Sequence, residues 1–143
     1  MAKVSGTSGN GSKQIEQEMI ARFGFAPDFY QALPESALVD EWAVQRDFEL
    51  AETVIPNKYK ELIGLAVAAH IKCRYCIYFH SEAAKAFGAS DEELKEAAFM
   101  GGMTAQFSNT LTGMQVELDH FKREVDRAIE HMTSHEPAAS PAH

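Results

Sequence analysis

The residues with the clearest chemical potential lie in one short stretch, CRYCIYFH, at residues 73–80. Cys73 and Cys76 are the only two cysteines of the chain, and His80 follows the second by four residues. On a helix that begins near Cys73, these spacings put all three side chains on one face. The stretch could therefore be a redox pair, part of a metal site, or a set of core residues that share a helix face.

The start of a helix favours the redox interpretation. The first turn presents unpaired N–H groups and the positive end of the helix dipole, and Lys72 and Arg74 flank the first sulfur. Both effects lower the pKa of a thiol and raise the thiolate fraction that a reactive cysteine needs. This argument favours Cys73 as the more acidic thiol. His80, one turn beyond Cys76, is placed to take or give a proton.

Two other interpretations compete with it. Cysteine is often buried, and a lone histidine on an apolar face is commonly a core residue, so a structural cluster would explain the same pattern. A zinc site would need a fourth ligand, because structural zinc usually takes four ligands from two short clusters. The chain has no second Cys/His cluster, and Glu61 is the nearest upstream candidate. The sequence therefore predicts no resident metal and no cofactor.

The bulk properties restrict the class of protein. A chain of 143 residues with 45% hydrophobic and 24% charged residues is typical of one globular domain. A net charge of −8 argues against binding to nucleic acid or to an anionic membrane surface. The first residues lack the apolar core of a signal peptide, and no apolar run reaches the roughly 18 residues of a membrane span. We expect a cytoplasmic protein, where a CxxC pair is more often catalytic or metal-binding than structural.

Helical periodicity dominates the chain, and no alternating strand pattern stands out. One all-α domain is predicted over residues 13–132, with its core motif at 57–108. The Gly/Ser-rich segment 1–12 and the proline-containing tail 133–143 are predicted to be disordered. Within the domain, Ser90 and Glu93 form a capping box that opens a helix to about residue 108, and a final helix is expected at 111–132. Without a βαβ unit, the CxxC pair does not belong to a thioredoxin domain.

The remaining predicted helices cover residues 13–23, a short segment PDFYQAL, residues 35–52, residues 57–70, and a stretch from Cys73 or Arg74 to Phe87.

The segment ELIGLAVAAHIKCRYCIYFHSEAAKAFGASDEELKEA resembles the core of the carboxymuconolactone decarboxylase family, specifically its alkylhydroperoxidase (AhpD-like) branch. The family pattern is a glutamate, eleven residues, and C-x-x-C-x-x-x-H. Glu61, Cys73, Cys76 and His80 match it. The lead-in GFAPDFYQAL is also similar, so the resemblance covers roughly residues 24–108.

This resemblance implies a compact all-helical bundle of about six to seven helices that assembles as a homo-oligomer, a trimer or hexamer. It also implies a dithiol that reduces hydroperoxides, with Cys76 as the peroxidatic thiolate and Cys73 as the resolving thiol. His80 would accept the thiol proton, and Glu61 would orient that imidazole through a water molecule. The decarboxylase members lack the cysteine pair, which argues against a lyase. The implied partners are a hydroperoxide and a dithiol reductant of unknown identity.

One position departs from the family pattern. The best-known peroxidase members carry a second histidine just before the second cysteine, and here that position is Tyr75. A tyrosine with a pKa of about 10 is a poor proton relay at neutral pH. A general thiol–disulfide oxidoreductase and a non-enzymatic redox-sensing helical protein therefore stay open as alternatives.

Overall fold

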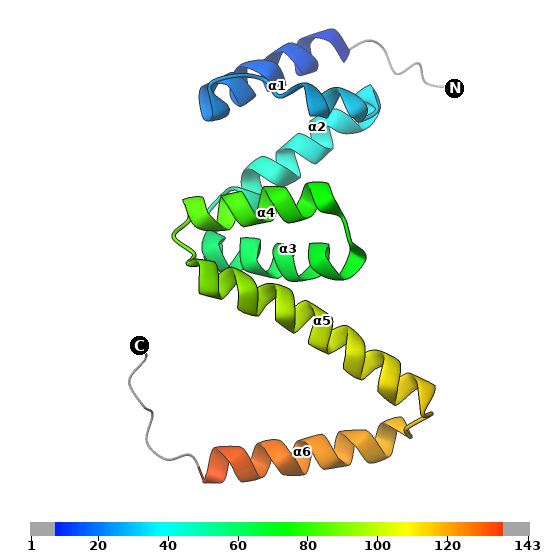
Figure 1. The fold of residues 1–143 in the computed structure, drawn as a ribbon. Helices are drawn as coiled ribbons and strands as arrows, with labels where there is room; N and C mark the ends of the chain where they lie inside the picture. Colours follow the sequence, from blue (N-terminus) through cyan, green and yellow to red (C-terminus); the bar gives the residue numbers. More distant parts are fainter. Residues whose placement is uncertain (1–7, 136–143) are drawn as a thin grey trace, which may run out of the picture.

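The computed structural model describes residues 8–135, and this part of the chain consists of helices joined by short links, with no strand. Six α-helices follow one another, together with a short 3-10 helix (η1) and a π-helical segment (η2) (Figure 1). Their bounds are α1 Ser8–Phe23, η1 Asp28–Ala32, α2 Glu35–Val44, η2 Gln45–Glu49, α3 Asn57–Ile71, α4 Arg74–Ala86, α5 Asp91–Gly113 and α6 Leu118–Ser134. The all-α prediction is confirmed for this range.

The N-terminal helices pack around the single tryptophan. Trp42 of α2 is only 1% exposed, and Ile15 and Met19 of α1 and Tyr30 of η1 complete the buried cluster. The indole Nε1–H of Trp42 donates to Glu18 at 2.8 Å, a bond that lowers the pKa of this carboxyl together with a 2.6 Å ion pair to Arg46. Polar and apolar contacts thus fasten α1 to α2.

The CxxC segment belongs to a second layer in which α3 packs along both α4 and α5 (Figure 1). The approach of α5 to α3 is close: a Cβ added at Gly101 would lie 2.3 Å from the Ala66 carbonyl oxygen. A 2.7 Å ion pair between Lys58 and Glu93 joins the same two helices. Both halves of the predicted capping box are present at the start of α5, where the Ser90 hydroxyl accepts from Glu93 N–H and the Glu93 carboxylate accepts from Ser90 N–H.

Several helix boundaries differ from the sequence prediction, including that of the helix expected over 35–52, which is α2 to Val44 followed by η2 to Glu49. Helix α1 begins at Ser8, so residues 8–12 of the segment predicted to be disordered are helical. The first turn packs on α2, where the Cβ position of Gly11 lies 3.6 Å from a Val39 methyl, and such tertiary contact overrides the low helix propensity of glycine. Residues 1–7 and 136–143 lie outside the described part of the chain.

The predicted break between two helices near residue 110 is wrong, because α5 continues to Gly113. The Thr110 hydroxyl donates to the Gln106 carbonyl at 3.0 Å, which satisfies this polar side chain inside the helix. The chain turns instead at Gln115, which has a positive φ of 54°. Glu117 then caps α6 by accepting from the N–H groups of Asp119 and His120, and α6 runs to Ser134, two residues into the predicted tail.

The prediction of a compact bundle is also wrong. The distal part of α5 leads away from the other helices, and α6 lies apart from them (Figure 1). Every residue of α6 is exposed, including the apolar stripe formed by Leu118, Phe121, Val125, Ile129 and Met132. Within one chain, no described helix covers this stripe. No helix in residues 8–135 is both long and apolar enough to span a membrane.

Candidate active site

The two cysteines lie where α3 ends and α4 begins, and they are joined as a disulfide. Lys72 closes α3 in the left-handed conformation, with a φ of 58°, and turns the chain within two residues. Cys73 is the N-cap of α4, and its sulfur accepts the backbone N–H of Cys76 at 3.3 Å. The helix start predicted from the spacing is therefore the one observed, and it holds the Cα atoms of the pair 5.3 Å apart.

The side chains around the disulfide are polar and largely open to solvent. The guanidinium of Arg74 lies over the Tyr75 ring, 5.1 Å from its centre, and donates to the phenol oxygen at 3.2 Å. Tyr75 itself is 75% exposed. Both cysteines are partly buried.

A carboxylate–imidazole pair lies one helical turn further along α4. The Nδ1 atom of His80 is 2.7 Å from the Oε2 atom of Glu61, which reaches across from α3. Glu61 is fully buried and His80 is 19% exposed at its side chain. The family resemblance implied a water between them, and the direct contact corrects that detail. It follows that the carboxylate can fix the ring orientation without an intermediary.

A glycine of α3 makes room for this ring. A Cβ built on Gly64 would lie 2.5 to 2.7 Å from three atoms of the His80 imidazole, well inside van der Waals contact. Only a residue without a side chain leaves the imidazole its place against α3. Gly64 is thus a determinant of the site that the sequence analysis did not identify, although a glycine amid the apolar residues of a helix is a detectable signal.

A second carboxylate approaches the same pair from the N-terminal layer. Glu49, the last residue of η2, offers an oxygen that lies within 4.8 Å of ligand atoms of both Glu61 and His80. The sequence analysis missed it, because a helix of ordinary period gives no reason to aim residue 49 at α3. π-helical turns shift the register of the residues that follow and are frequent at functional sites.

An open pocket of about 600 Å³ borders this cluster on the side of Glu49 and Gly64. The charge of Glu49 also acts on Tyr30, which lines this pocket. The pKa of the Tyr30 phenol is raised to about 12, mainly by burial and to a lesser extent by this charge. The lining is mainly apolar, and it consists of Phe29, Tyr30, Leu33, Glu41, Val44, Gln45, Phe48, Glu49, Ile55, Lys60, Ile63 and Gly64. An apolar group bound here would lie beside the carboxylate–imidazole cluster.

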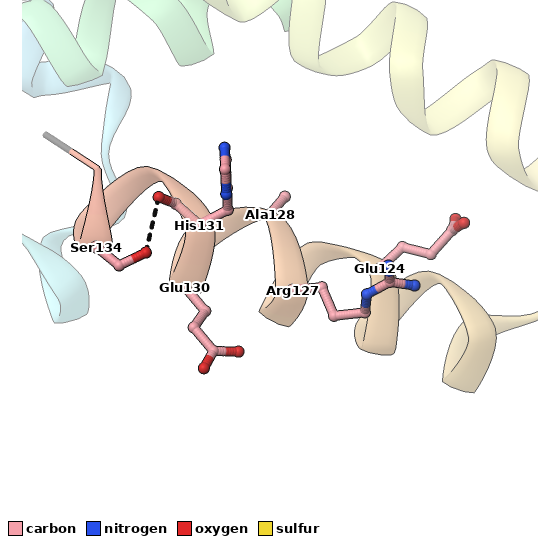
Figure 2. A pocket seen from close by; sticks show the side chains of 6 residues that line it. All are labelled: Glu124, Arg127, Ala128, Glu130, His131 and Ser134. Atoms are coloured by element: carbon pink, nitrogen blue, oxygen red, sulfur yellow. Dashed lines mark hydrogen bonds between the residues drawn. The ribbon is translucent and has the colours of Figure 1, made fainter.

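A different hollow, of about 580 Å³, runs along α6 and is shown in Figure 2. Its lining residues all belong to α6, and the Ser134 hydroxyl donates to the His131 carbonyl at 3.1 Å. Because α6 is exposed along its whole length, this hollow is a groove beside one helix rather than an enclosed site. It contains none of the predicted site residues.

Fold and site together define a class: helical proteins with a CxxC pair at a helix start and a glutamate–histidine pair one turn away. The chain belongs to the carboxymuconolactone decarboxylase family, whose model matches residues 38–116. Within that family it is AhpD-like. It is similar to the crystal structure of the alkylhydroperoxidase AhpD core from Rhodospirillum rubrum, with a TM-score of 0.68, 25% identity, and coverage of 79% of this chain and 86% of that one. No curated protein matches the chain.

Proposed function

We propose that the protein is a thiol-dependent peroxidase that reduces hydroperoxides through Cys73 and Cys76. The observation that carries the proposal is the combination of a disulfide at a helix start with a buried carboxylate–histidine pair one turn away. A dithiol alone supports many redox roles. A base that is oriented by a third group is the arrangement expected where a nucleophile must be activated.

The proposed cycle has two chemical steps. The Cys76 thiolate attacks one oxygen of ROOH, so that an S–O bond forms, the O–O bond breaks, and the departing alkoxide takes a proton to become ROH. Cys73 then attacks the sulfenic sulfur, forming the disulfide and releasing water. The peroxide gains two electrons and the dithiol loses them. An external dithiol restores the two thiols by exchange.

The proposed roles of Glu61 and His80 follow from their contact. A carboxylate only accepts hydrogen bonds, so the 2.7 Å contact assigns the ring proton to Nδ1 of His80 and leaves the Nε2 lone pair free. That lone pair is available to accept the proton of Cys76, one turn earlier on α4. Glu61 then stabilises the imidazolium that forms.

The choice of Cys76 as the attacking thiol comes from the family resemblance, whereas the N-cap position favours Cys73 as the more acidic one. Single Cys→Ser variants separate the two assignments. Cys73→Ser should still consume one equivalent of peroxide and stop at a sulfenic acid that a dimedone probe labels. Cys76→Ser should consume none. The opposite pattern would reverse the roles of the two cysteines.

The apolar lining beside Glu49 and Gly64 supports an organic hydroperoxide as substrate. A stopped-flow assay of the reduced protein, followed with cumene hydroperoxide and with hydrogen peroxide, tests this point and the activity itself. We expect faster consumption of the organic substrate. Failure to consume either peroxide would refute the peroxidase.

A general thiol–disulfide oxidoreductase is the second candidate, and Tyr75 favours it. This exposed tyrosine stands where the resemblance expects a second proton-transferring histidine. Reduction of a small disulfide by the dithiol form, together with slow peroxide turnover, would identify this alternative. A redox-sensing protein would turn over neither the peroxide nor the small disulfide.

Assembly, location and partners are part of the same proposal. The uncovered apolar stripe of α6 supports a homo-oligomer, a trimer or hexamer, that covers it. A cytoplasmic location would keep the pair reducible by an external dithiol.

A further inference from the structure

The cluster of Glu49, Glu61 and His80 has one buried atom that the thiol chemistry does not explain. The Oε1 atom of Glu61 is buried and has no hydrogen-bond partner in the described part of the chain, although its sister oxygen Oε2 contacts His80. The residue is 0% exposed. A buried charged oxygen without a partner is costly, so it marks a place where another group belongs.

Within the cluster itself, acidic groups outnumber basic ones. Two carboxylates meet one imidazole, which carries at most one positive charge. Lys60 donates to the carbonyl oxygens of Phe48 and Ala51 at 2.5 Å each, and Arg46 pairs with Glu18 and Asp47. Neither forms an ion pair with Glu49 or Glu61 in the described part of the chain. A cation placed between the three groups would balance this excess negative charge.

The donor set selects the kind of cation. Carboxylate oxygens alone suit magnesium or calcium, whereas an added imidazole nitrogen shifts the preference to divalent transition metals, with zinc above manganese. Three protein ligands with a fourth position open is the usual arrangement of a non-structural zinc site. The three ligand atoms lie within 4.8 Å of one another, so one ion can reach all of them after small side-chain shifts.

We propose that Glu49, Glu61 and His80 form a binding site for one divalent transition-metal ion, and Zn²⁺ is the probe used to test it. The sequence predicted no metal because it offered only the cysteine cluster and Glu61, and the cysteines are closed in a disulfide here. The site proposed here uses no sulfur. Glu49 belongs to this cluster and also lines the apolar pocket.

Binding of the ion would have a consequence for the thiol chemistry. The metal takes the lone pair of a ligating histidine, so an occupied site withdraws His80 from proton transfer. This consequence, unlike the site itself, rests on the proposed function. Zinc should therefore slow peroxide consumption, and the Glu49→Gln variant should be less sensitive to it.

Zinc binding is tested on the full chain in its disulfide form, in which neither sulfur is a free thiolate. Titration with ZnCl₂ by isothermal calorimetry should give one ion per chain in the wild type. Glu49→Gln should bind at least about tenfold more weakly, because even the loss of an outer partner of a metal ligand costs about 10- to 100-fold. Glu41→Gln is the matched control, since Glu41 lines the same pocket but lies outside the cluster.

The outcomes discriminate clearly. A loss confined to Glu49→Gln supports the site. Equal weakening by both substitutions would show only general attraction by negative charge, and unchanged affinity in Glu49→Gln would place the zinc elsewhere, such as on the histidines of α6. Either result, or no binding, overturns the proposal.

A second measurement needs no variant, in case Glu49→Gln fails to fold. Added Mn²⁺ should broaden the amide NMR signals of Gly64 and His80 before those of α6. Broadening that begins on α6 would contradict the proposed position.

Discussion

Replacing Glu61 by glutamine isolates the charge of the carboxylate from its shape. In the wild type a fully buried carboxylate contacts the His80 ring at 2.7 Å. Glutamine keeps the volume and an accepting oxygen, so the ring can stay where Gly64 admits it. The substitution removes only the negative charge that would stabilise an imidazolium.

The expected size of the effect follows from the type of hydrogen bond. A bond to a charged group contributes roughly 1.5–3 kcal/mol and a neutral one about 0.5–1.5 kcal/mol. The difference of about 1–1.5 kcal/mol reduces the ability of His80 to hold the thiol proton by about tenfold, since about 1.4 kcal/mol corresponds to a factor of ten. Glu61→Gln should thus slow peroxide consumption by about tenfold and lower the thiolate fraction at neutral pH.

The assay is stopped-flow consumption of peroxide by the reduced protein, with a chelator present so that a bound metal plays no part. Ultraviolet absorbance of the thiolate, followed against pH, gives the second readout. Glu82→Gln, an exposed carboxylate on α4, is the matched control and should leave both readouts unchanged. Circular dichroism confirms the fold of each variant. A Glu61→Gln protein with the wild-type rate and the wild-type thiolate titration would refute the role given to the carboxylate.

Further predictions concern the ring pocket, the acid limb of stability and assembly. Gly64→Ala should displace the imidazole, lower the rate and destabilise the fold by about 1–3 kcal/mol in urea unfolding, whereas Gly102→Ala, which meets nothing within 4 Å, should be neutral or stabilising. The pKa of Glu93 is lowered mainly by the Lys58 ammonium and next by the hydrogen bond from the Ser90 backbone. The ionised carboxylate therefore stabilises the fold at pH values above its ordinary pKa of 4.5, and this contribution is lost as the pH falls through the lowered pKa. Glu93→Gln should flatten that limb of the stability curve, and an unchanged limb would contradict the argument. Light scattering should report a homo-oligomer, and Val125→Asp should weaken the association of its subunits. A wild-type protein that is monomeric at micromolar concentration would contradict this prediction.

The layer that carries the dithiol was predictable because its signals are local. Apolar periodicity indicated α3 and α4, and the Ser90 capping box indicated the start of α5. Gly88, with a φ of 86°, lies two residues past the end of α4. The spacing of Cys73 and Cys76 placed both at one helix start. The pairing of Glu61 with His80 came from the family pattern, since two residues on different helices share no periodicity.

Glu49 could not be found in this way, because two non-local facts decide its position. The chain from α2 passes through a π-helical segment whose extra residue per turn rotates the residues that follow. The layer that contains η2 must then meet α3 at the depth where Glu61 is buried. Amphipathic patterns indicate which face of a helix is covered but not which element covers it. From the sequence alone, Glu49 is therefore interpreted as an ordinary surface carboxylate.

The same limit applies to α6, whose apolar pattern does not say what covers it. Leu118, Phe121, Val125 and Ile129 recur at three- and four-residue steps, which indicates a face that avoids water. Within one chain that face stays open, since α5 extends three residues past Thr110 and carries α6 away from the other helices. The family match ends at residue 116, two residues before α6 begins. The dithiol layer and the α6 face therefore differ in what completes them. The contacts between Glu61 and His80 lie within one chain, whereas a partner for the α6 face belongs to the proposed homo-oligomer.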